Sequence, residues 1–599
     1  MRSNPRAPGA AQTDSERAIF NKEMRFLWVG GISLIAGCVA FLLLFQSSSL
    51  WDRAIPLPGG DDGPFGAIRH LFPDEWLDAR RSSPLGLLNA AIYLVILASL
   101  FTTYWLVLWR AFRFQKRGNG PLLSIGGQGN RLLWYILLVT ALALFVLLWL
   151  PGTQSSDLHS YIWYGRILAT FGDNPLVHPP FKYASRDAGD WLSQVYWKDV
   201  PSVYGPVWVL LAGGVAWLSN LVSSSEMWPH LLGHKLLASG AHLVNVALMW
   251  QVSGLVAERY GCPPNSDSSP DRANDVERQR GAQLVATLVY AWCPLALIEF
   301  GGNGHNDALM ITGVMSALWL HLSGHWRLAA VAFGLAILVK VAALLLLPGY
   351  LWLLFWNPPT KRSSKQSLNS GATESSQFKT QDRLLIITQA LLIVIATLTL
   401  LYLPFWEGPV TLSPLLGGPA SSRFTNSLAS MLRYNGAEWL HSFATAYGWE
   451  AIARQNVEAL RGYLEGPLRL LAFSVIVPIA LVATWRGRTF PLMVQGWGWV
   501  LFVYLTVGAV WFWPWYATWL LPLAGLICRG RLFTAIQLLC ATSLILYAVY
   551  PLMPAPLEQV PYYRSLITIA PPLAYVAFSG LGTFLRRRKL SVHPSPSRT

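Results

Sequence analysis

The stretch "SSDLHSYIWYGRILATFGDNPLVHPP", Ser155–Pro180, begins a few residues after a long apolar run ends. It brings acidic, basic, histidine and tyrosine side chains together, although a simple connection between two membrane helices does not need them. Spacings of three and four over 156–169 predict a short helix. One face of it carries Asp157, Tyr161, Tyr164 and Leu168, and another carries His159, Trp163 and Arg166. We expect this helix to lie along the membrane surface, with its Trp and Tyr rings at headgroup depth.

The composition predicts an all-α polytopic membrane protein. The 599 residues are 53% hydrophobic and 13% charged, whereas soluble domains are about a quarter charged. Several apolar runs reach the ~20 residues that cross a bilayer. The net charge of +15 comes from Lys and Arg at the ends of these runs, as the positive-inside bias predicts, so no nucleic-acid partner is indicated. The five Cys show neither a disulfide framework nor a zinc pattern.

The apolar runs predict 12 to 15 crossings of the membrane. The runs lie near 26–46, 86–109, 132–151, 205–222, 231–256, 281–300, 307–322, 327–357, 384–405, 466–485, 490–510, 516–528, 532–552 and 564–585. The expected division is a cytoplasmic tail 1–25, two additional spans in 26–131, a catalytic module 132–357, a flexible cytoplasmic loop 358–383, a C-terminal module 384–585 and a cytoplasmic tail 586–599.

Basic residues set the expected orientation in the plasma membrane. They gather before the first run and in the loop after the second, which places both inside and the segments 152–204, 406–465 and 511–516 outside. The middle of the chain has two solutions. If 205–222 crosses the membrane, residues 301–306 face inward. If 205–222 is interfacial or re-entrant, they face outward, and 327–357 crosses twice with a break near Lys340 or at Pro348-Gly349.

Asp157 is the leading candidate for a catalytic group. A carboxylate just beyond the bilayer can accept a proton from a hydroxyl within hydrogen-bond reach. The alternative is that Ser156 or Asp157 caps the helix. Three motifs follow Asp157 in the same loop: "DNP" at 173–175, "HPP" at 178–180 and "VYGPVW" at 203–208. They favour an ordered functional loop, because long ordered loops usually carry function.

These motifs resemble the first outward loop of the GT-C superfamily of membrane glycosyltransferases. The closest branch is the bacterial polyprenol-phosphate-mannose-dependent mannosyltransferases, which have an Asp after a span, then "YGR", "NPY" and "YGP". Three further stretches are similar to that family in order: "AWCPLALIEFGGNGHNDALM" (291–310), "LAILVKVAALLLLP" (335–348) and "WFWPWYATWLLPLAG" (511–525). This chain departs at Leu176, where the family has an aromatic, and at Cys293, where Asn is usual. The resemblance covers about 130–525.

The resemblance implies an inverting transfer of a sugar, with mannose expected, from a polyprenyl-phosphate donor to a glycan or glycolipid acceptor on the outward face. Asp157 is the implied base. The donor phosphate would be held by Lys340, His305 or Arg166, in that order of preference. The expected substrate-binding residues are Tyr161, Tyr164, Arg166, Asn174, Tyr204, His305, Asn306, Asp307, Lys340, Trp515 and Tyr516. Membrane lipids are the other expected partners. No cofactor is certain, and a divalent metal is left open.

The turn "GGNGHND" has structural and functional interpretations. Gly301 or Gly302 can end a helix in the left-handed conformation, and Asn306 or Asp307 can cap the next helix. Neither role explains His305, and ionisable groups at membrane depth are functional candidates. His305 and Asp307 are therefore expected to bind phosphate or sugar, or to help ligate a metal. Glu299, in the run before the turn, is expected to pair with Arg or Lys.

Other candidates have equally plain alternatives. Lys340 holds a lipid-linked phosphate or extends its ammonium from a helix end to the interface. "WFWPWY" forms a platform for sugar or polyprenyl, or an aromatic belt with a helix break. Arg423 is a second phosphate clamp or a solvated loop charge.

Two rival functions remain from sequence alone. A transporter or lipid flippase needs polar groups along a path through both leaflets, often with duplicated halves, and a non-catalytic assembly protein needs only the scaffold. Convergence of Asp157, His305 and Lys340 on one cavity open to the outer leaflet and to the outside water favours the transferase.

Overall fold

The protein is all-α. The computed structural model describes residues 8–46, 84–117, 128–150, 155–186, 190–261, 272–358, 379–417, 424–552 and 560–592. Within these ranges the one pairing of extended chain is an isolated bridge between Thr425 and Trp511. Arg423 and most of the loop 358–383 fall outside the described residues.

The first half of the chain supplies long helices and the short elements of the loop 152–204. They are α1 Pro8–Gln46, α4 Pro84–Arg117, α5 Gln128–Leu148, α6 Asp157–Ala169, η3 Pro180–Arg186, η4 Trp191–Gln194, α7 Pro206–Val222, α8 Trp228–Tyr260, α9 Arg272–Ala291, α10 Pro294–Leu297, η5 Ile298–Gly302, α11 Asp307–Leu322, α12 Trp326–Val339, η6 Val341–Leu346 and α13 Leu347–Trp356. α1 begins at Pro8, so helix already runs through most of the segment expected as a polar tail.

The second half continues with α14 Thr380–Tyr402, η8 Leu403–Phe405, η9 Pro409–Leu412, α15 Ser413–Gly417, α17 Leu428–Ala446, α18 Glu450–Ala453, α19 Val457–Arg486, α20 Phe490–Val503, η10 Tyr504–Gly508, η11 Pro514–Leu520, α21 Leu521–Ile527, α22 Gly530–Leu552 and α23 Val560–Val592. The expected span 516–528 is instead a 3-10 turn followed by a seven-residue helix. Proline at positions 514 and 522 explains this, because proline cannot donate to the helical ladder.

The protein is a polytopic membrane protein. Eight helices in the described ranges are long and apolar enough to cross a membrane, and a bent pair, Gln279–Ala291 with Pro294–Gly302, makes up to nine. Four shorter apolar helices, α7, α11, α12 and η6 with α13, accompany them. The expected range of 12 to 15 crossings holds only if these shorter helices cross as well.

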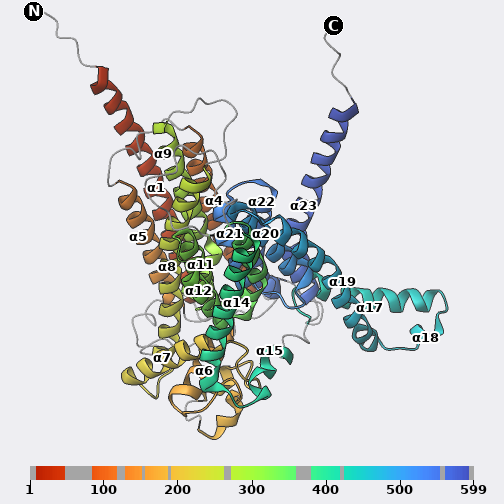
Figure 1. Cartoon of the computed structure of the whole chain (residues 1–599). Helices are drawn as coiled ribbons and strands as arrows, with labels where there is room; N and C mark the ends of the chain where they lie inside the picture. The colour runs from red at the N-terminus through yellow and green to blue at the C-terminus, as the bar shows by residue number, and fades with distance from the viewer. Residues whose placement is uncertain are drawn as a thin grey trace, which may run out of the picture.

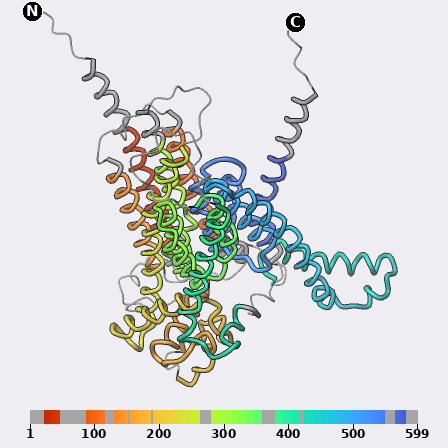
Figure 2. Tube along the Cα trace, viewed as in Figure 1, coloured from red at the N-terminus to blue at the C-terminus, as the bar shows by residue number. Residues whose placement is uncertain are grey.

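The helices form one bundle with a distinct end. Figure 1 shows α6, α7 and α15 together at the end of the bundle opposite to α9, with α7 lying across the direction of the long helices. Figure 2 shows that the segments 155–222 and 403–417 meet at this end although they are far apart in sequence. The arrangement of α7 fits the interfacial alternative for 205–222. The main buried apolar core of the described residues runs through the bundle from α1 to α22, and a small second cluster is formed by Leu176, Val209 and Phe405.

The long run 327–357 is broken at Lys340, as expected. Lys340 is extended, with φ −151° and ψ 122°, between the end of α12 and the 3-10 turn η6. The break turns the lysine side chain out of a helical array and toward the start of α11. This geometry gives the candidate site its cation.

Candidate active site

Asp157 stands at the start of α6, beside aromatic donors. The helix buries Leu158 through Ile167, whereas Asp157 itself is partly exposed. Ser156 occupies the N-cap position, as the capping interpretation expected, but it makes no side-chain capping hydrogen bond, and Asp157 is the first residue of the helix. The surrounding protein removes water from most of the carboxyl group, and this desolvation raises the pKa of Asp157 to about 6, although the nearby Lys340 and hydrogen bonds from Trp197 and Tyr204 favour the carboxylate.

The helix α6 is not a surface helix. Both of its faces are covered, since α7 and α8 pack against it, and its Tyr161, Trp163 and Tyr164 side chains are fully buried. These rings therefore contact protein and not lipid, and their depth relative to the membrane stays a prediction. An amphipathic pattern cannot distinguish a helix that lies on lipid from one that is enclosed by its own loop.

Tyr161 links the loop 152–204 to the "GGNGHND" turn. Its hydroxyl lies 3.3 Å from that of Tyr204 and 3.5 Å from Nδ1 of His305, and it donates to Oδ1 of Asn306 at 3.3 Å. Its ring also packs edge-on against Trp208. The loop 152–204 and the turn therefore occupy the same end of the bundle, which fits the topology with an interfacial 205–222.

The backbone conformation of the "GGNGHND" turn differs from the one predicted. Gly301 and Gly302 lie in the π-helical turn η5, and the left-handed residue is Gly304 at φ 69°. Asn306 is the N-cap of α11 but makes no side-chain capping hydrogen bond there. The amide oxygen of Asn306 instead accepts from Tyr161, and the Asp307 carboxylate points to Lys340.

Asp307 and Lys340 form a buried ion pair. Lys340 Nζ donates to Asp307 Oδ1 at 2.7 Å, and the indole N–H of Trp519 donates to the same oxygen. Three rings surround the ammonium, with centroids 5.6 Å away for Tyr204, 4.9 Å for Tyr516 and 5.4 Å for Trp519. Because Tyr204 hydrogen-bonds Asp157 and also packs on Lys340, the carboxylate and the ion pair belong to one cluster.

His305 lies between protein groups on both sides. Its ring stacks on Trp515 with centroids 4.0 Å apart, and its Nε2 lies 3.4 Å from Oε2 of Glu299. Glu299 was expected to pair with Arg or Lys; its described partners are His305, Asn303 and Tyr547.

Three of the expected site residues lie apart from this cluster. Tyr164 donates to the carbonyl of Val200. The Arg166 guanidinium lies over Trp191 and Trp163, at 4.1 and 4.9 Å from the ring centroids. Asn174 donates to the carbonyl of Phe405 and to Glu407. These contacts fasten the loop 152–204 to its surroundings, and substrate binding by these three residues stays a prediction.

Residues absent from the sequence-based list complete the cluster. Trp197 and Trp519 donate to Asp157 and Asp307 respectively. Lys235, fully enclosed in α8, donates to the carbonyls of Leu148 and Leu150 at the end of α5. The sequence signal for Lys235 was a lysine inside an apolar run, which is a functional or structural anchor by default.

A metal centre finds no support in the described part of the chain. No group of three or more His, Cys, Asp or Glu side chains in the described ranges could hold a metal ion. Asp157 and Asp307 interact electrostatically, but Asp307 is already engaged by a lysine and an indole. The possible divalent metal thus remains without a ligand set here.

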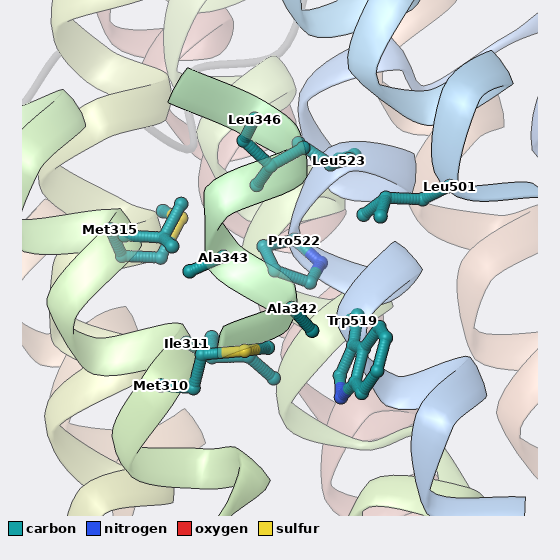
Figure 3. A pocket seen from close by; sticks show the side chains of 11 residues that line it. Met310, Ile311, Met315, Ala342, Ala343, Leu346, Leu501, Trp519, Pro522 and Leu523 are labelled. Carbon is teal, nitrogen blue, oxygen red and sulfur yellow. The ribbon is translucent and has the colours of Figure 1, made fainter. Parts of the chain in front are cut away.

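An apolar pocket adjoins the ion pair. It is lined by Met310, Ile311, Val314 and Met315 of α11, Ala342, Ala343 and Leu346 of η6, Leu501 of α20, and Trp519, Pro522 and Leu523 of η11 and α21. Figure 3 shows Trp519 and Leu346 at opposite ends of this pocket in that view. Trp519 is shared with the polar cluster through its bond to Asp307, so charge and apolar surface are contiguous.

The fold and the site define a polytopic all-α membrane protein with an acidic, aromatic and cationic cluster at one end of its bundle. Residues 272–356 match the model of the MptA_B family, alpha-(1→6)-mannopyranosyltransferase, N-terminal domain. The match fits the resemblance to GT-C mannosyltransferases and supports a role in mannosyl transfer. It covers Glu299, His305, Asp307 and Lys340 but not Asp157. No curated protein and no solved structure matched the chain.

Proposed function

We propose that the protein transfers a mannosyl group from a polyprenyl-phosphate donor to a hydroxyl of a glycan or glycolipid acceptor, with inversion at the anomeric carbon. One observation carries the proposal. Asp157, Tyr204, Asp307 and Lys340 come from four separate segments, yet Tyr204 contacts both the base candidate and the cation candidate. A base and a phosphate-binding cation at one point are what this reaction requires.

The donor is proposed from the contiguity of cation and pocket. An ammonium has three N–H donors, and the pair with Asp307 occupies one Lys340 donor. The donor phosphate would accept from the others. The apolar pocket beside Trp519 has a volume of only about 20 Å³, so Met310 and Met315 would have to move to admit the first isoprene unit. Met310 and Met315 suit a flexible branched chain, because methionine adapts to irregular shapes.

The proposed reaction has one proton transfer and one substitution. Asp157 accepts the proton of the acceptor hydroxyl as that oxygen attacks the anomeric carbon from the face opposite the phosphate. The bond between the anomeric carbon and the phosphate oxygen breaks, and its electron pair stays on the phosphate. Lys340 stabilises the charge that develops there. His305 is not the cation of choice, because its two ring nitrogens face Tyr161 and Glu299.

We further propose that the cluster faces outward at the plasma membrane and that 132–357 is the catalytic module. Two arguments support the orientation. The basic loops lie at the other ends of the predicted spans, and Asp157 is partly exposed, so a water-borne acceptor can reach it. The loop 358–383 and the two terminal segments would then be cytoplasmic.

The test is mannosyl transfer in proteoliposomes from a synthetic polyprenyl-phosphate mannose. Wild-type protein should form a mannoside whose anomeric configuration, read by NMR, is opposite to that of the donor. Asp157→Asn should lower the rate by about 10²–10⁴, the usual range for loss of a general base. A wild-type rate in Asp157→Asn rejects Asp157 as the base, and retention of configuration rejects the single displacement.

A further inference from the structure

An open groove lies between α19 and α20 and shares no residue with the proposed active site. It has a volume of about 400 Å³, within the range of ligand sites, ~300–1,000 Å³. α19 is the least covered of the eight candidate spans in the described ranges, and Figure 1 shows it leaving the bundle toward α17 and α18. The groove is therefore open to the membrane along one side.

Two facing stripes of side chains line the groove, each with helical spacings of three and four. Their members include Ile479, Val482 and Arg486 of α19 and Leu492, Gln495 and Trp499 of α20. Between the stripes a Cβ on Gly496 would lie 3.0 Å from the carbonyl oxygen of Ala483. The glycine thus permits the close approach of the two backbones along the groove.

The polarity of the groove changes along its length. α19 ends at Arg486 and α20 begins at Phe490, so the two helices are antiparallel and Arg486 lies at the turn that joins them. Gln495 follows about 8 Å along α20, and Ile479 and Trp499 lie about 11 to 14 Å from the turn. Charge, amide and apolar surface therefore occur in the order of the phosphate, glycerol esters and acyl chain of a phospholipid.

The two polar side chains of the groove have no protein partner. Arg486 and Gln495 are both exposed, and the side chain of neither forms a hydrogen bond or ion pair with a described residue. None of the residues that line the groove is acidic. An unpaired amide on the open side of a membrane span is costly, so a ligand with acceptors for both groups fits the groove.

A second arginine at the same turn lies differently. The Arg488 guanidinium is 4.4 Å from the ring centroid of Trp356 and 5.3 Å from that of Trp485, and it does not line the groove. Arg486 and Arg488 carry the same charge at the same end of α19, but only Arg486 is placed to bind a ligand in the groove.

We propose that this groove binds one anionic phospholipid, with its phosphate on Arg486, its ester carbonyls at Gln495 and one acyl chain along Trp499. A guanidinium binds phosphate in a bidentate manner. The basic turn is predicted to lie inside the cell, where anionic lipids attract basic residues. The inference is independent of the proposed mannosyl transfer, because it uses none of the residues of the proposed active site.

The test measures lipid binding to the purified full chain in detergent by native mass spectrometry. The probes are phosphatidylglycerol and phosphatidylcholine with the same acyl chains. Wild type should prefer phosphatidylglycerol about fivefold, the effect of one basic residue near an anionic lipid. Arg486→Gln should remove this preference, whereas the matched control Arg488→Gln should keep it. Val482→Trp fills the groove without a change of charge, so it should weaken binding of both lipids.

Three outcomes overturn the inference. Equal affinity of wild type for the two lipids excludes an anionic site. Equal loss of preference in Arg486→Gln and Arg488→Gln shows general attraction to a basic turn. Displacement of phosphatidylglycerol by an equimolar polyprenyl phosphate shows that the groove takes that lipid instead. The substituted side chains are exposed, and melting curves confirm that each variant folds. Because no transfer is measured, failure of the proposed function gives a separate result.

Discussion

Lys340 Nζ lies 2.7 Å from Asp307 Oδ1 in a buried ion pair that joins two helix ends. Lys340 is the single extended residue between α12 and η6, and Asp307 is the first residue of α11. The indole of Trp519 donates to the same carboxylate oxygen. One pair thus fixes three elements around the place where we propose that the donor phosphate binds.

Breaking this pair should cost both stability and activity. Lys340→Gln leaves the Asp307 carboxylate enclosed without its cation, and removal of one partner of a buried pair costs about 3–5 kcal/mol. Thermal unfolding in detergent measures the loss. Replacing both residues, as Lys340→Gln with Asp307→Asn, should recover much of the stability, because no uncompensated charge remains.

The double variant separates structure from catalysis. If Lys340 also binds the donor phosphate, transfer stays low in the double variant although stability returns. Recovery of both stability and transfer would show that Lys340 serves the fold alone.

The rate of transfer should follow the ionisation of Asp157. Burial raises its pKa to about 6, and the base acts only as carboxylate. At pH 5 roughly a tenth of the protein has the ionised form, and above about pH 7 nearly all has it. The kcat should therefore rise through pH 6 and then level. A profile that is flat from pH 5 to 8 in wild type contradicts this assignment.

Asp157→Asn should be much slower than wild type yet at least as stable at pH 8. A carboxyl with a raised pKa holds its proton more tightly in the folded state, so wild type loses stability as pH rises from about 4 to about 6 and does not regain it above. The neutral Asn lacks this penalty. Melting temperatures of both proteins at pH 5 and pH 8 check it: the advantage of Asp157→Asn should be roughly twice as large at pH 8 as at pH 5. A variant that melts lower at pH 8 contradicts the penalty.

The fold class and several local features could be predicted from the sequence because they depend on local pattern. Apolar length gives the helices, and the break at Lys340 follows from a run too long for one crossing with a charge in its middle. The helix at 157–169 follows from its spacing. These features depend on residues that are adjacent in the sequence, so the sequence pattern is enough to predict them.

The partners of the site residues could not be predicted in this way. Trp519 reaches Asp307 across 212 positions, and Tyr547 reaches Glu299 across 248. Nothing near either carboxylate in the sequence indicates an indole or a phenol. Arg166 shows the converse, because its basic character suggested phosphate, whereas tertiary packing places it on Trp191.

Arg166 should matter for stability more than for chemistry. Its guanidinium lies over two indole rings, and a desolvated contact of this kind contributes up to about 2 kcal/mol. Arg166→Gln should lower the melting temperature while kcat at saturating donor stays within about twofold of wild type, since no bond to the reacting groups is lost. A fall of tenfold or more in kcat, with unchanged melting, would return Arg166 to the list of phosphate ligands.

Gly304 should be the least replaceable glycine of the turn. It has φ 69°, and a Cβ there would lie 3.1 Å from Cδ1 of Leu158 and 3.3 Å from Cγ of Lys235. Gly324 is the matched control, because it has φ 86° but open space around it. Gly324→Ala should cost about 1–2 kcal/mol from backbone strain alone.

Gly304→Ala adds crowding against α6 and α8, so it should unfold at lower temperature than Gly324→Ala. It should also lower transfer, because displacement of the turn moves His305 and Asn306 away from Tyr161. Equal melting temperatures for the two variants, with unchanged transfer in Gly304→Ala, would show that the turn yields freely and that its packing does not set the geometry of the site.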